Sequence, residues 1–567
     1  MLLSESVTTR TEVVAEHGVV TGGEMAEAQA GVEILQAGGN AMDAVIAAAF
    51  VGFVVEPASC GIGGYGHLSY FRAADVSFAT IDHYARAPQA ARADMFELGP
   101  PHELKYYGFP YTKGHRAEMG FLAPAVPGAV AGLFEAHSRY GRLPWAALIA
   151  PAIVAAEAGL AVTWKLLLMI AQREVDIRRY RPLANWLMPA GRLPLIAGQI
   201  GTGERLDCSA LAGTLRLIRD KGAAGFHDGP VARSIARTIA QGGGILTTED
   251  ISSYRPRILQ ENPCRYRGHD YITAFDQVGY EALNILGHFD LASMGPDSLE
   301  FRHVMAEALA MAYVDSMAHY GDPDHTQSPV DGLVSSGFAA ERAASIRMNL
   351  AIARPVAAGD PWPYSATRRP IVPATPGRSG VAGTSQMAVC DGEGNMASLI
   401  VSHSSAFGSL IMDPETGVIL NNCMQNFDPR PQTANRIEPG KMPIFAAPTL
   451  VAARDGKASF AAAGSGGYRI TTGVLHSFIH AVDFGMSIQA AVDAPRVHCQ
   501  GDETYVDARI AASQRDAMAK MGHRVVAQID DPGLNAFARV NAIKVDPTTG
   551  LRHAGTGPAW ASAAAGY

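Results

Sequence analysis

Thr384 and Ser402 are the two residues whose types and spacing best suit a chemical role. The residues on either side of the segment 391–395 are apolar or β-branched, as in paired strands, and the segment itself contains two glycines and an asparagine, which accept positive φ in a turn. If Cys390 pairs with Met396, Thr384 lies opposite Ser402, with Cβ atoms about 4.5–5.5 Å apart. This is the layout of a self-cleaving hydrolase with an N-terminal nucleophile. On its own, however, the hairpin fits an ordinary loop-to-strand junction better, because threonine is a good strand residue.

The composition is that of a large globular chain. It has 567 residues, of which 48% are hydrophobic and 18% are charged, and its formal net charge is −8. The length exceeds one ordinary core, so it predicts two or more domains or one large multilayer domain. No Lys- or Arg-rich run is present, which argues against a nucleic-acid partner.

Neither a leader peptide nor a membrane span is expected from the sequence. The chain turns polar after Leu3, and its most apolar stretch, residues 143–156, contains Pro144 and Pro151 and is too short to cross a bilayer. We therefore expect a cytoplasmic protein with no membrane partner. The six cysteines form no CxxC pair and no zinc-type spacing, so we expect reduced thiols, no metal and no organic cofactor. Cys423 is the cysteine that lies near the segments considered below.

Helical patterns dominate the first two-thirds of the chain, and strand patterns dominate the last third. The expected helices are 22–53 (a pair broken at 38–40), 127–160, 211–241, 302–320, 469–485 and 511–521. The expected strands are 67–71, 74–81, 384–402, 417–420, 448–454 and 459–463. Residues 355–383 are rich in Pro, Gly and Arg, which predicts an exposed linker or processing loop. This order favours one composite domain with sheets between helical layers, and two independent domains are the alternative.

A glycine-rich run at residues 60–66 superficially resembles a phosphate-binding loop. It lacks the Lys-Ser/Thr pair of such loops and precedes a strand pattern instead of a helix. The run is therefore interpreted as a tight turn before the strand pair at 67–81.

Several collinear motifs give the sequence a specific family resemblance. The main ones are Gly383-Thr384-Ser385-Gln386, Ser402-His403-Ser404-Ser405-Ala406-Phe407-Gly408, Gly417-Val418-Ile419-Leu420-Asn421-Asn422-Cys423-Met424 and Gly464-Ser465-Gly466-Gly467-Tyr468-Arg469-Ile470. Further matches extend from Gly38-Gly39-Asn40 to the terminal Ala565-Gly566-Tyr567. Together these motifs resemble the γ-glutamyltransferase (γ-glutamyltranspeptidase) family over nearly the whole chain.

The resemblance implies a proenzyme with a four-layer αββα sandwich of the N-terminal nucleophile hydrolase type. Such a chain cuts itself before a threonine, here between Gly383 and Thr384. The products would be a large subunit, residues 1–383, and a small subunit, residues 384–567, which stay together as a heterodimer within one composite domain. A freed α-amine on Thr384 would act as the base for its own hydroxyl, because it titrates near neutrality, with a pKa of about 7.7–8.0.

The resemblance also implies roles for other catalytic residues. Ser402 replaces a threonine whose hydroxyl holds the nucleophile, and it keeps the hydroxyl. Gly466 and Gly467 match paired glycines whose N–H groups form an oxyanion hole, a role worth about 10²–10³ in rate per donor. A solvated strand serine and a simple turn before the helix at Arg469 are the alternatives.

The positions that recognise the γ-glutamyl group depart from the family pattern. Tyr84 stands in place of the arginine that grips the substrate carboxylate, and Arg86, two residues later on the same side of an extended chain, is a possible substitute. The other altered positions are Ser404 for an asparagine, Asn426 for an aspartate, and Ile444 and Phe445 for a pair of serines. An α-amino-acid head group in this pocket would leave buried polar groups unmatched, at about 1–3 kcal/mol each.

Three hypotheses follow for the function of this chain. The first is an autoprocessed threonine amidohydrolase, with transfer to an amine acceptor as a variant, acting on a small amide whose acyl group differs from γ-glutamyl. The family includes cephalosporin acylases and oxamate amidohydrolases, which act on other amides. The second is a γ-glutamyltransferase or glutathione hydrolase with a rearranged pocket, and the third is an unprocessed, non-catalytic relative that binds a ligand.

Overall fold

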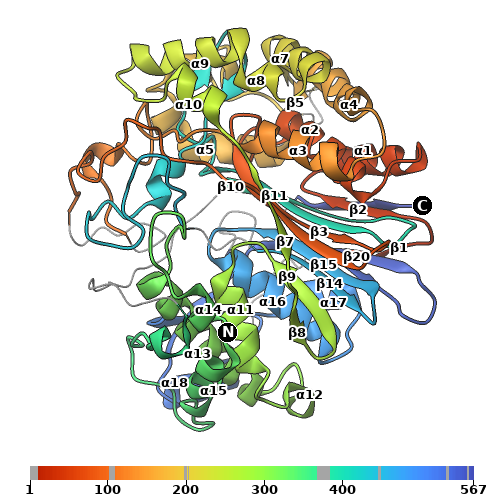
Figure 1. Ribbon diagram of the computed structural model, residues 1–567, viewed down its shortest axis with the longest axis vertical. Helices are drawn as coiled ribbons and strands as arrows, with labels where there is room; N and C mark the ends of the chain where they lie inside the picture. The colour runs from red at the N-terminus through yellow and green to blue at the C-terminus, as the bar shows by residue number, and fades with distance from the viewer. Residues whose placement is uncertain are drawn as a thin grey trace.

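Two antiparallel sheets stacked face to face form the centre of the molecule (Figure 1). The computed structural model describes residues 10–100, 109–196, 201, 203–366, 383–444, 448–530, 536–558 and 561–567. Within these residues each of the two sheets has seven strands, and helices cover both outer faces. The αββα sandwich expected from the family resemblance is confirmed.

The sheet that carries Thr384 is called the β10 sheet. Its strands, in spatial order, are β21 (Ala563–Gly566), β2 (Val19–Gly22), β10 (Gly383–Cys390), β11 (Met396–Ser404), β3 (Tyr65–Arg72), β4 (Ser77–His83) and β7 (Arg257–Glu261). The strand pair expected at 67–81 is the β3–β4 hairpin.

The second sheet is called the β15 sheet. Its strands, in spatial order, are β1 (Val13–Ala15), β20 (Arg552–Thr556), β19 (Arg539–Val545), β15 (Lys457–Ser465), β14 (Thr449–Arg454), β9 (His269–Thr273) and β8 (Cys264–Tyr266). Both sheets combine strands from before and after residue 383, so neither half of the chain completes a sheet alone. Small sheets lie outside the sandwich: β5–β6 (Leu160–Ala161, Arg205–Leu206), β12–β13 (Met412–Asp413, Val418–Ile419) and β16–β17–β18 (Val497–Cys499, Glu503–Asp507, Arg524–Gln528).

One helical layer covers the outer face of each sheet (Figure 1). The layer on the β10 sheet contains α1 (Met25–Gln36), α2 (Ala41–Val55), α3 (Ala129–Tyr140), α4 (Trp145–Glu157), α5 (Trp164–Ile177), α6 (Arg181–Leu187), α7 (Ser209–Lys221), α8 (Ala224–His227), α9 (Gly229–Gln241) and α10 (Thr248–Ser253). The layer on the β15 sheet contains α11 (Gln277–Leu286), α12 (Leu291–Met294), α13 (Leu299–His319), α14 (Val330–Leu333), α15 (Ser336–Ala344), α16 (Arg469–Val482), α17 (Ile488–Asp493) and α18 (Ala512–Lys520). Single 3₁₀ turns lie at Lys113–His115, Trp362–Tyr364 and Cys423–Asn426.

Helix α2 supports the strand that carries Thr384. It is apolar on nearly all sides and buried from Ala41 to Val54, as expected for a helix in the core of a large protein. Asn40 and Asp43 form a capping box that fixes its start. The helix packs against both β10 and β11, so it holds the hairpin from the outside of the sandwich.

The helices differ from the sequence expectations in two ways. The segments 127–160 and 211–241 each divide into separate helices, because Gly141 precedes the bend at Pro144 and Gly222 takes a φ of 61°. The segment expected as an amphipathic helix at 302–320 is α13, which is buried on all sides from Phe301 to Ser316. Its charges are matched inside the protein instead of facing solvent, for example by the pairing of Glu307 with Arg354.

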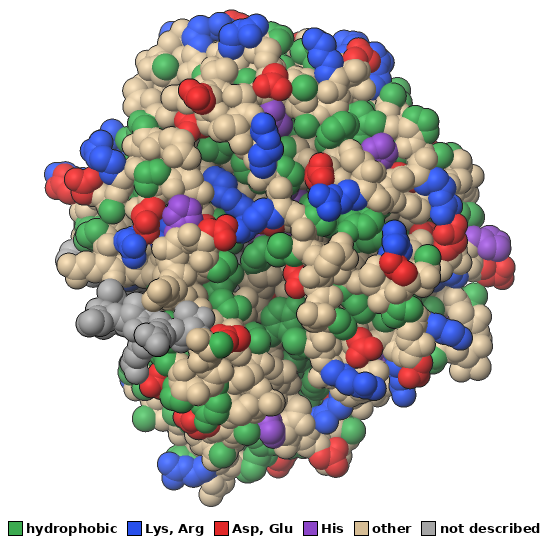
Figure 2. All heavy atoms as spheres, viewed as in Figure 1, with side chains coloured by type: hydrophobic (Ala, Val, Ile, Leu, Met, Phe, Trp, Pro, Cys, Tyr) green, Lys and Arg blue, Asp and Glu red, His purple; other side chains and the backbone are tan. Residues whose placement is uncertain are grey.

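The surface and the remaining parts of the chain add three observations. Figure 2 shows a hollow near the middle of one face, where hydrophobic side chains gather below a group of Lys and Arg side chains. Within the described residues, no helix combines the length and the apolar composition needed to cross a bilayer. Most of the expected processing loop, residues 367–382, lies outside the described residues.

Candidate active site

Thr384 lies near the start of β10, directly opposite Ser402 of β11. The register pairs Cys390 with Met396 at the turn and Thr384 with Ser402 at the far end, as the sequence predicts. A bulge between Gly383 and Thr384 brings Gly383 opposite Ser404, which has a φ of 78°. This left-handed conformation costs about 1–3 kcal/mol in a non-glycine residue, so its neighbours must hold it in place.

The Ser402 hydroxyl connects Thr384 to the carbonyl of the preceding peptide bond. Its Oγ lies 3.0 Å from Thr384 Oγ1, 2.8 Å from the Gly383 carbonyl oxygen and 2.8 Å from the Ser404 nitrogen. The carbonyl can only accept, so Ser402 donates its single proton to Gly383. Thr384 must then donate its hydroxyl proton to Ser402. The Ser402 hydroxyl thus binds both the hydroxyl proton of Thr384 and the carbonyl oxygen of the Gly383–Thr384 peptide bond.

A buried guanidinium connects strand β10 to the β15 sheet. Arg539 donates from Nη2 to the Thr384 carbonyl at 2.9 Å and from Nε to Ser465 Oγ at 2.7 Å. Glu56, at the end of α2, accepts a hydrogen bond from Ser385 and pairs with Lys165, and it lies 3.8 Å from Arg539 Nη1. Burial lowers the pKa of Arg539 to about 10, which leaves it charged at neutral pH. Thr384 and Ser385, on either side of the Thr384 carbonyl, are therefore fixed by buried charge-assisted contacts.

Gly466 and Gly467 directly follow Ser465 at the end of β15. Their φ values of 137° and 64° belong to the region that favours glycine, and α16 begins two residues later at Arg469. Through Ser465 and Arg539 this turn is linked to the Thr384 carbonyl. The two glycines therefore follow the end of β15 that Arg539 joins to the backbone of β10 at Thr384.

Three of the residues expected to bind substrate lie together in one buried cluster. Asn426 Oδ1 accepts from Ser404 Oγ at 3.0 Å, and its Nδ2 donates to the hydroxyl groups of Tyr84 at 3.1 Å and Tyr65 at 3.2 Å. The two tyrosine rings lie 4.4 Å apart. The cluster is polar but contains no charged side chain. The cluster lies next to Ser402 along β11, because Ser404 belongs to the cluster and its N–H also donates to Ser402 Oγ.

Arg86 forms an ion pair inside the protein. Its guanidinium contacts Asp82, which also accepts from Arg257 Nε at 2.8 Å, and it donates to the Tyr84 carbonyl at 3.2 Å. The charge of Arg86 is therefore matched within the protein.

Ile444 lines a cavity beside the glycine turn, and Phe445 lies outside the described residues. The lining of this cavity includes Phe275, Val278, Tyr320 and Tyr468, the residue after Gly467. Most of its wall is thus aromatic or aliphatic.

Cys423 has no features of a reactive thiol. It is fully buried, burial raises its pKa to about 12, and it accepts a hydrogen bond from Asn426 Nδ2 at 3.4 Å. At neutral pH it stays protonated and serves as a weak acceptor within the Asn426 cluster.

Comparison with known proteins identifies the family. The sequence profile of the family described as "Gamma-glutamyltranspeptidase" matches residues 27–567 of this chain. The chain belongs to this family. It is 35% identical over 528 residues to the Acylase ACY 1 proenzyme of Pseudomonas sp. (strain V22), covering 92% of this chain and 89% of the relative. It is 32% identical over 515 residues to the Glutathione hydrolase proenzyme of Pseudomonas sp. (strain A14), covering 88% and 84%.

A solved structure of a cephalosporin acylase shows the same fold. The cephalosporin acylase from Bacillus halodurans superposes with a TM-score of 0.85 at 29% identity, covering 100% of this chain and 99% of that chain. The family assignment made from the motifs is therefore confirmed, and the chain is an enzyme of a hydrolase family.

Sequence reasoning missed part of the site. Arg539, Glu56 and Tyr65 were not singled out, although they contact Thr384, Ser385 and Asn426. Their signals were weak, because each is a single residue far from the motif that it serves. A buried arginine in an apolar strand pattern at 539–545 is the one feature that could have drawn attention to Arg539.

Proposed function

We propose that this chain is a threonine amidohydrolase that first cuts its own Gly383–Thr384 bond. One observation carries the proposal: Ser402 Oγ accepts the Thr384 proton while it donates to the Gly383 carbonyl oxygen. The arrangement orients the Thr384 hydroxyl and polarises the bond that it would attack. Membership in a family with relatives named as proenzymes gives independent support.

The cut proceeds as an acyl shift from nitrogen to oxygen. Thr384 Oγ1 bonds to the Gly383 carbonyl carbon, its proton passes to Ser402, and Ser402 gives its own proton to the carbonyl oxygen. When the C–N bond breaks, the Thr384 nitrogen takes up that proton, leaving an ester between Gly383 and the threonine hydroxyl. Water then hydrolyses the ester, which releases the Gly383 carboxylate and a free Thr384 amine.

Amide hydrolysis reuses the same groups. The free amine takes the proton of Thr384 Oγ1, which attacks the substrate carbonyl, and the N–H groups of Gly466 and Gly467 stabilise the developing oxyanion. The substrate amine leaves with the proton. Water attacks the acyl ester in the second step, regenerating the threonine. An amine in place of water would give transfer instead of hydrolysis.

The acyl group is proposed to be uncharged and largely apolar at its far end. The Asn426 cluster offers neutral hydrogen-bonding groups, and the charge of Arg86 is matched by Asp82. The side chains of Ile444 and Tyr468 present a mainly apolar surface beside the glycine turn, which favours an apolar group over a charged one. A γ-glutamyl head group carries two charges that these residues do not match. We therefore favour an acylase over a glutathione hydrolase.

After the cut, the fragments 1–383 and 384–567 are proposed to stay together as a heterodimer. Strand β10 pairs with β2 and β11 pairs with β3, so separation would break backbone hydrogen bonds in the middle of a sheet.

Intact mass spectrometry of the freshly purified chain beside Thr384→Ala tests the cut. We expect two fragments whose masses correspond to residues 1–383 and 384–567, and the variant should lack them. The two fragments should elute together in size-exclusion chromatography. A single uncleaved mass in both samples would refute self-cleavage and favour an unprocessed, ligand-binding protein.

A paired substrate assay tests the acyl group. The cleaved enzyme is given γ-glutamyl anilide and an uncharged acyl anilide of similar length, for example butyryl anilide. We expect a higher kcat/KM for the uncharged substrate. A preference for γ-glutamyl anilide would instead support the transferase with a rearranged pocket.

A further inference from the structure

A buried lysine lies close to the start of β10. Lys165 is the second residue of α5, and its side chain is 4% exposed. The Lys165 ammonium contacts one carboxylate oxygen of Glu56, and the other oxygen of Glu56 accepts a hydrogen bond from the Ser385 hydroxyl. Proteins rarely bury a lysine without a partner. Through the Glu56 carboxylate, this lysine connects α5 and the end of α2 to the residue that follows Thr384.

The contact to Ser385 lies on the opposite face of β10 from the Thr384 hydroxyl. Alternate side chains of a strand face opposite sides of the sheet. Met387 packs in the apolar core with the residues of α2, whereas Ala388 packs with residues of the β15 sheet. Ser385 therefore faces the helical layer, and Thr384 faces the β15 sheet. Any effect of the lysine on the nucleophile passes through the backbone between these two residues.

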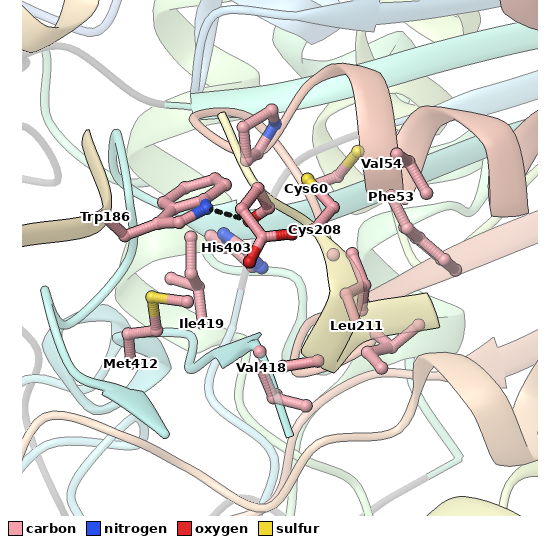
Figure 3. Close-up of a pocket in the computed structure, with 16 residues that line it drawn as sticks. Phe53, Val54, Cys60, Trp186, Cys208, Leu211, His403, Met412, Val418 and Ile419 are labelled. Atoms are coloured by element: carbon pink, nitrogen blue, oxygen red, sulfur yellow. Dashed lines mark hydrogen bonds between the residues drawn. The ribbon is translucent and has the colours of Figure 1, made fainter. Parts of the chain in front are cut away.

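Apolar side chains surround the last turn of α2, which ends just before Glu56. Phe53 and Val54 line a small pocket together with Cys60 and Leu211 (Figure 3). The side chain of Glu56 is itself fully buried. A carboxylate in such surroundings is costly to keep charged without a cation beside it, so Glu56 depends on its partner.

Several ionisable side chains surround the lysine and its partner. They are Glu24 and Glu27 of α1, Cys60, Arg539 of β19 and Arg10. Glu24 lies 3.6 Å from Lys165 Nζ, and Arg539 Nη1 lies 3.8 Å from Glu56. Burial and the charge of Arg539 lower the pKa of Lys165 to about 7, and burial raises the pKa of Glu27 to about 8. Lys165 is therefore charged in acidic solution and loses its proton as the pH rises through neutrality.

The charge of Lys165 decides how Glu56 binds Ser385. An ionised carboxylate can only accept hydrogen bonds, so it holds the Ser385 hydroxyl as a donor. A buried carboxylate that loses its cation takes up a proton instead of staying charged. Arg539 already donates to the Thr384 carbonyl, so drawing it toward Glu56 would release that carbonyl. In either case the backbone at Thr384 loses one of its anchors.

We propose that Lys165 and Glu56 are positioning residues for self-cleavage, which hold the backbone at Thr384 in place through Ser385. The inference rests on the proposed self-cleavage and adds a dependence on pH to it. The contribution of Lys165 is largest at low pH, where Glu56 would otherwise be protonated. It is lost as the pH rises, because the lysine becomes neutral and the carboxylate ionises without its help.

Time courses of fragment formation from the uncleaved chain at pH 6 and pH 9 test the inference. Lys165→Met keeps most of the side-chain volume and removes the charge. At pH 6 its cleavage is expected to be about 10–100-fold slower than in the native chain, the range that one hydrogen bond to a charged group supplies. At pH 9 the two rates should agree within about threefold. Ser385→Ala removes the hydroxyl and should be slowed by about 10–100-fold at both pH values.

A double variant and a matched control separate charge from stability. Glu56→Gln/Lys165→Met leaves an uncharged acceptor for Ser385, so its cleavage should stay within about tenfold of native at both pH values. In the control, Glu307→Gln/Arg354→Met, the lost ion pair is equally buried, but Glu307 belongs to α13 on the β15 sheet. The control should have a lower Tm and a cleavage rate within about threefold of native.

Three results would overturn the inference. A defect in Lys165→Met that is equal at pH 6 and pH 9 would point to lost packing instead of lost charge. A native rate in Ser385→Ala would show that the link does not pass through this hydroxyl. A defect in the control as large as that in Lys165→Met would show that loss of any buried pair slows the cut. If Lys165→Met fails to fold, Ser385→Ala and the double variant at the Glu56 pair still decide the matter.

Hydrogen exchange gives a readout that does not need cleavage, and it separates this inference from the proposed function. Exchange of residues 384–390 is compared in Thr384→Ala, which lacks the nucleophile, with and without Lys165→Met. Faster exchange with Lys165→Met at pH 6 and equal exchange at pH 9 would support the positioning of this backbone, even if the native chain proved to be uncleaved. Equal exchange at both pH values would refute it.

Discussion

Replacement of Ser402 by alanine is expected to slow cleavage at Gly383–Thr384 by about 10²–10³-fold. The hydroxyl makes three contacts at 2.8–3.0 Å, and alanine removes all of them. Loss of the donor to the Gly383 oxygen resembles loss of one oxyanion-hole donor, about 2.7–4 kcal/mol of transition-state stabilisation. In addition, the Ser404 N–H is left buried without this partner, which costs about 1–3 kcal/mol of folding stability.

The assay for this prediction is a time course of fragment formation. The uncleaved chain is purified in the cold and warmed, and the fragments 1–383 and 384–567 are quantified by intact mass and denaturing gel. Ser402→Thr keeps the hydroxyl and should restore a rate within about tenfold of the native one. Ser398→Ala is the matched control, because Ser398 lies on the same face of β11, is equally buried and donates to the Ala462 carbonyl at 2.7 Å.

Two outcomes would refute the reasoning about Ser402. If folded Ser402→Ala is cleaved within about threefold of the native rate, the contact to the Gly383 oxygen has no role in the cut. If Ser398→Ala slows cleavage as much as Ser402→Ala, the effect comes from weakening of the strand. Circular dichroism and thermal unfolding of each variant separate a rate defect from a folding defect.

Three further predictions concern other buried groups. Arg539→Lys removes the planar guanidinium that joins Ser465 to the Thr384 carbonyl. We therefore expect kcat to fall about 10–100-fold while KM stays within about twofold of the native value. A higher KM at unchanged kcat would contradict this prediction. Burial raises the pKa of Asp276 from 3.8 to about 7, so the folded state keeps a proton that the unfolded state releases. The free energy of unfolding therefore falls as the pH rises between these two values, by up to about 4 kcal/mol. Asp276→Asn should therefore lose less Tm than the native protein between pH 5 and pH 7.5, and an equal loss would argue against the raised pKa. Because its pKa is raised to about 12, Cys423 should resist iodoacetamide at pH 8 in the folded enzyme, and Cys423→Ser should stay active; inactivation by the reagent at this residue would show that the thiol is reactive.

The hairpin register could be predicted from the sequence because its signal is local, and the fold class could be predicted because many collinear motifs resemble one family. The turn at 391–395 fixes which residues of β10 and β11 face each other, and this places Thr384 opposite Ser402. The break between α1 and α2 could be predicted for the same reason, since Gly38-Gly39-Asn40 ends one helix and caps the next. Segment boundaries were less certain: α7 and α9 were predicted as one helix, although a glycine with positive φ lies between them.

The sequence by itself determined the family, the sandwich fold and the opposition of two hydroxyl groups, because motifs and turn chemistry act within a few residues. Only the tertiary structure decided which partners those residues meet. Arg539 reaches the Thr384 carbonyl from 155 residues away, and Asn426 meets Tyr84 from 342 residues away. Arg86 pairs with Asp82, and Asp82 also accepts from Arg257, 175 residues further along the chain. Such contacts depend on how two sheets and two helical layers stack, and this stacking is set by the burial of the whole core, which no single stretch of sequence encodes.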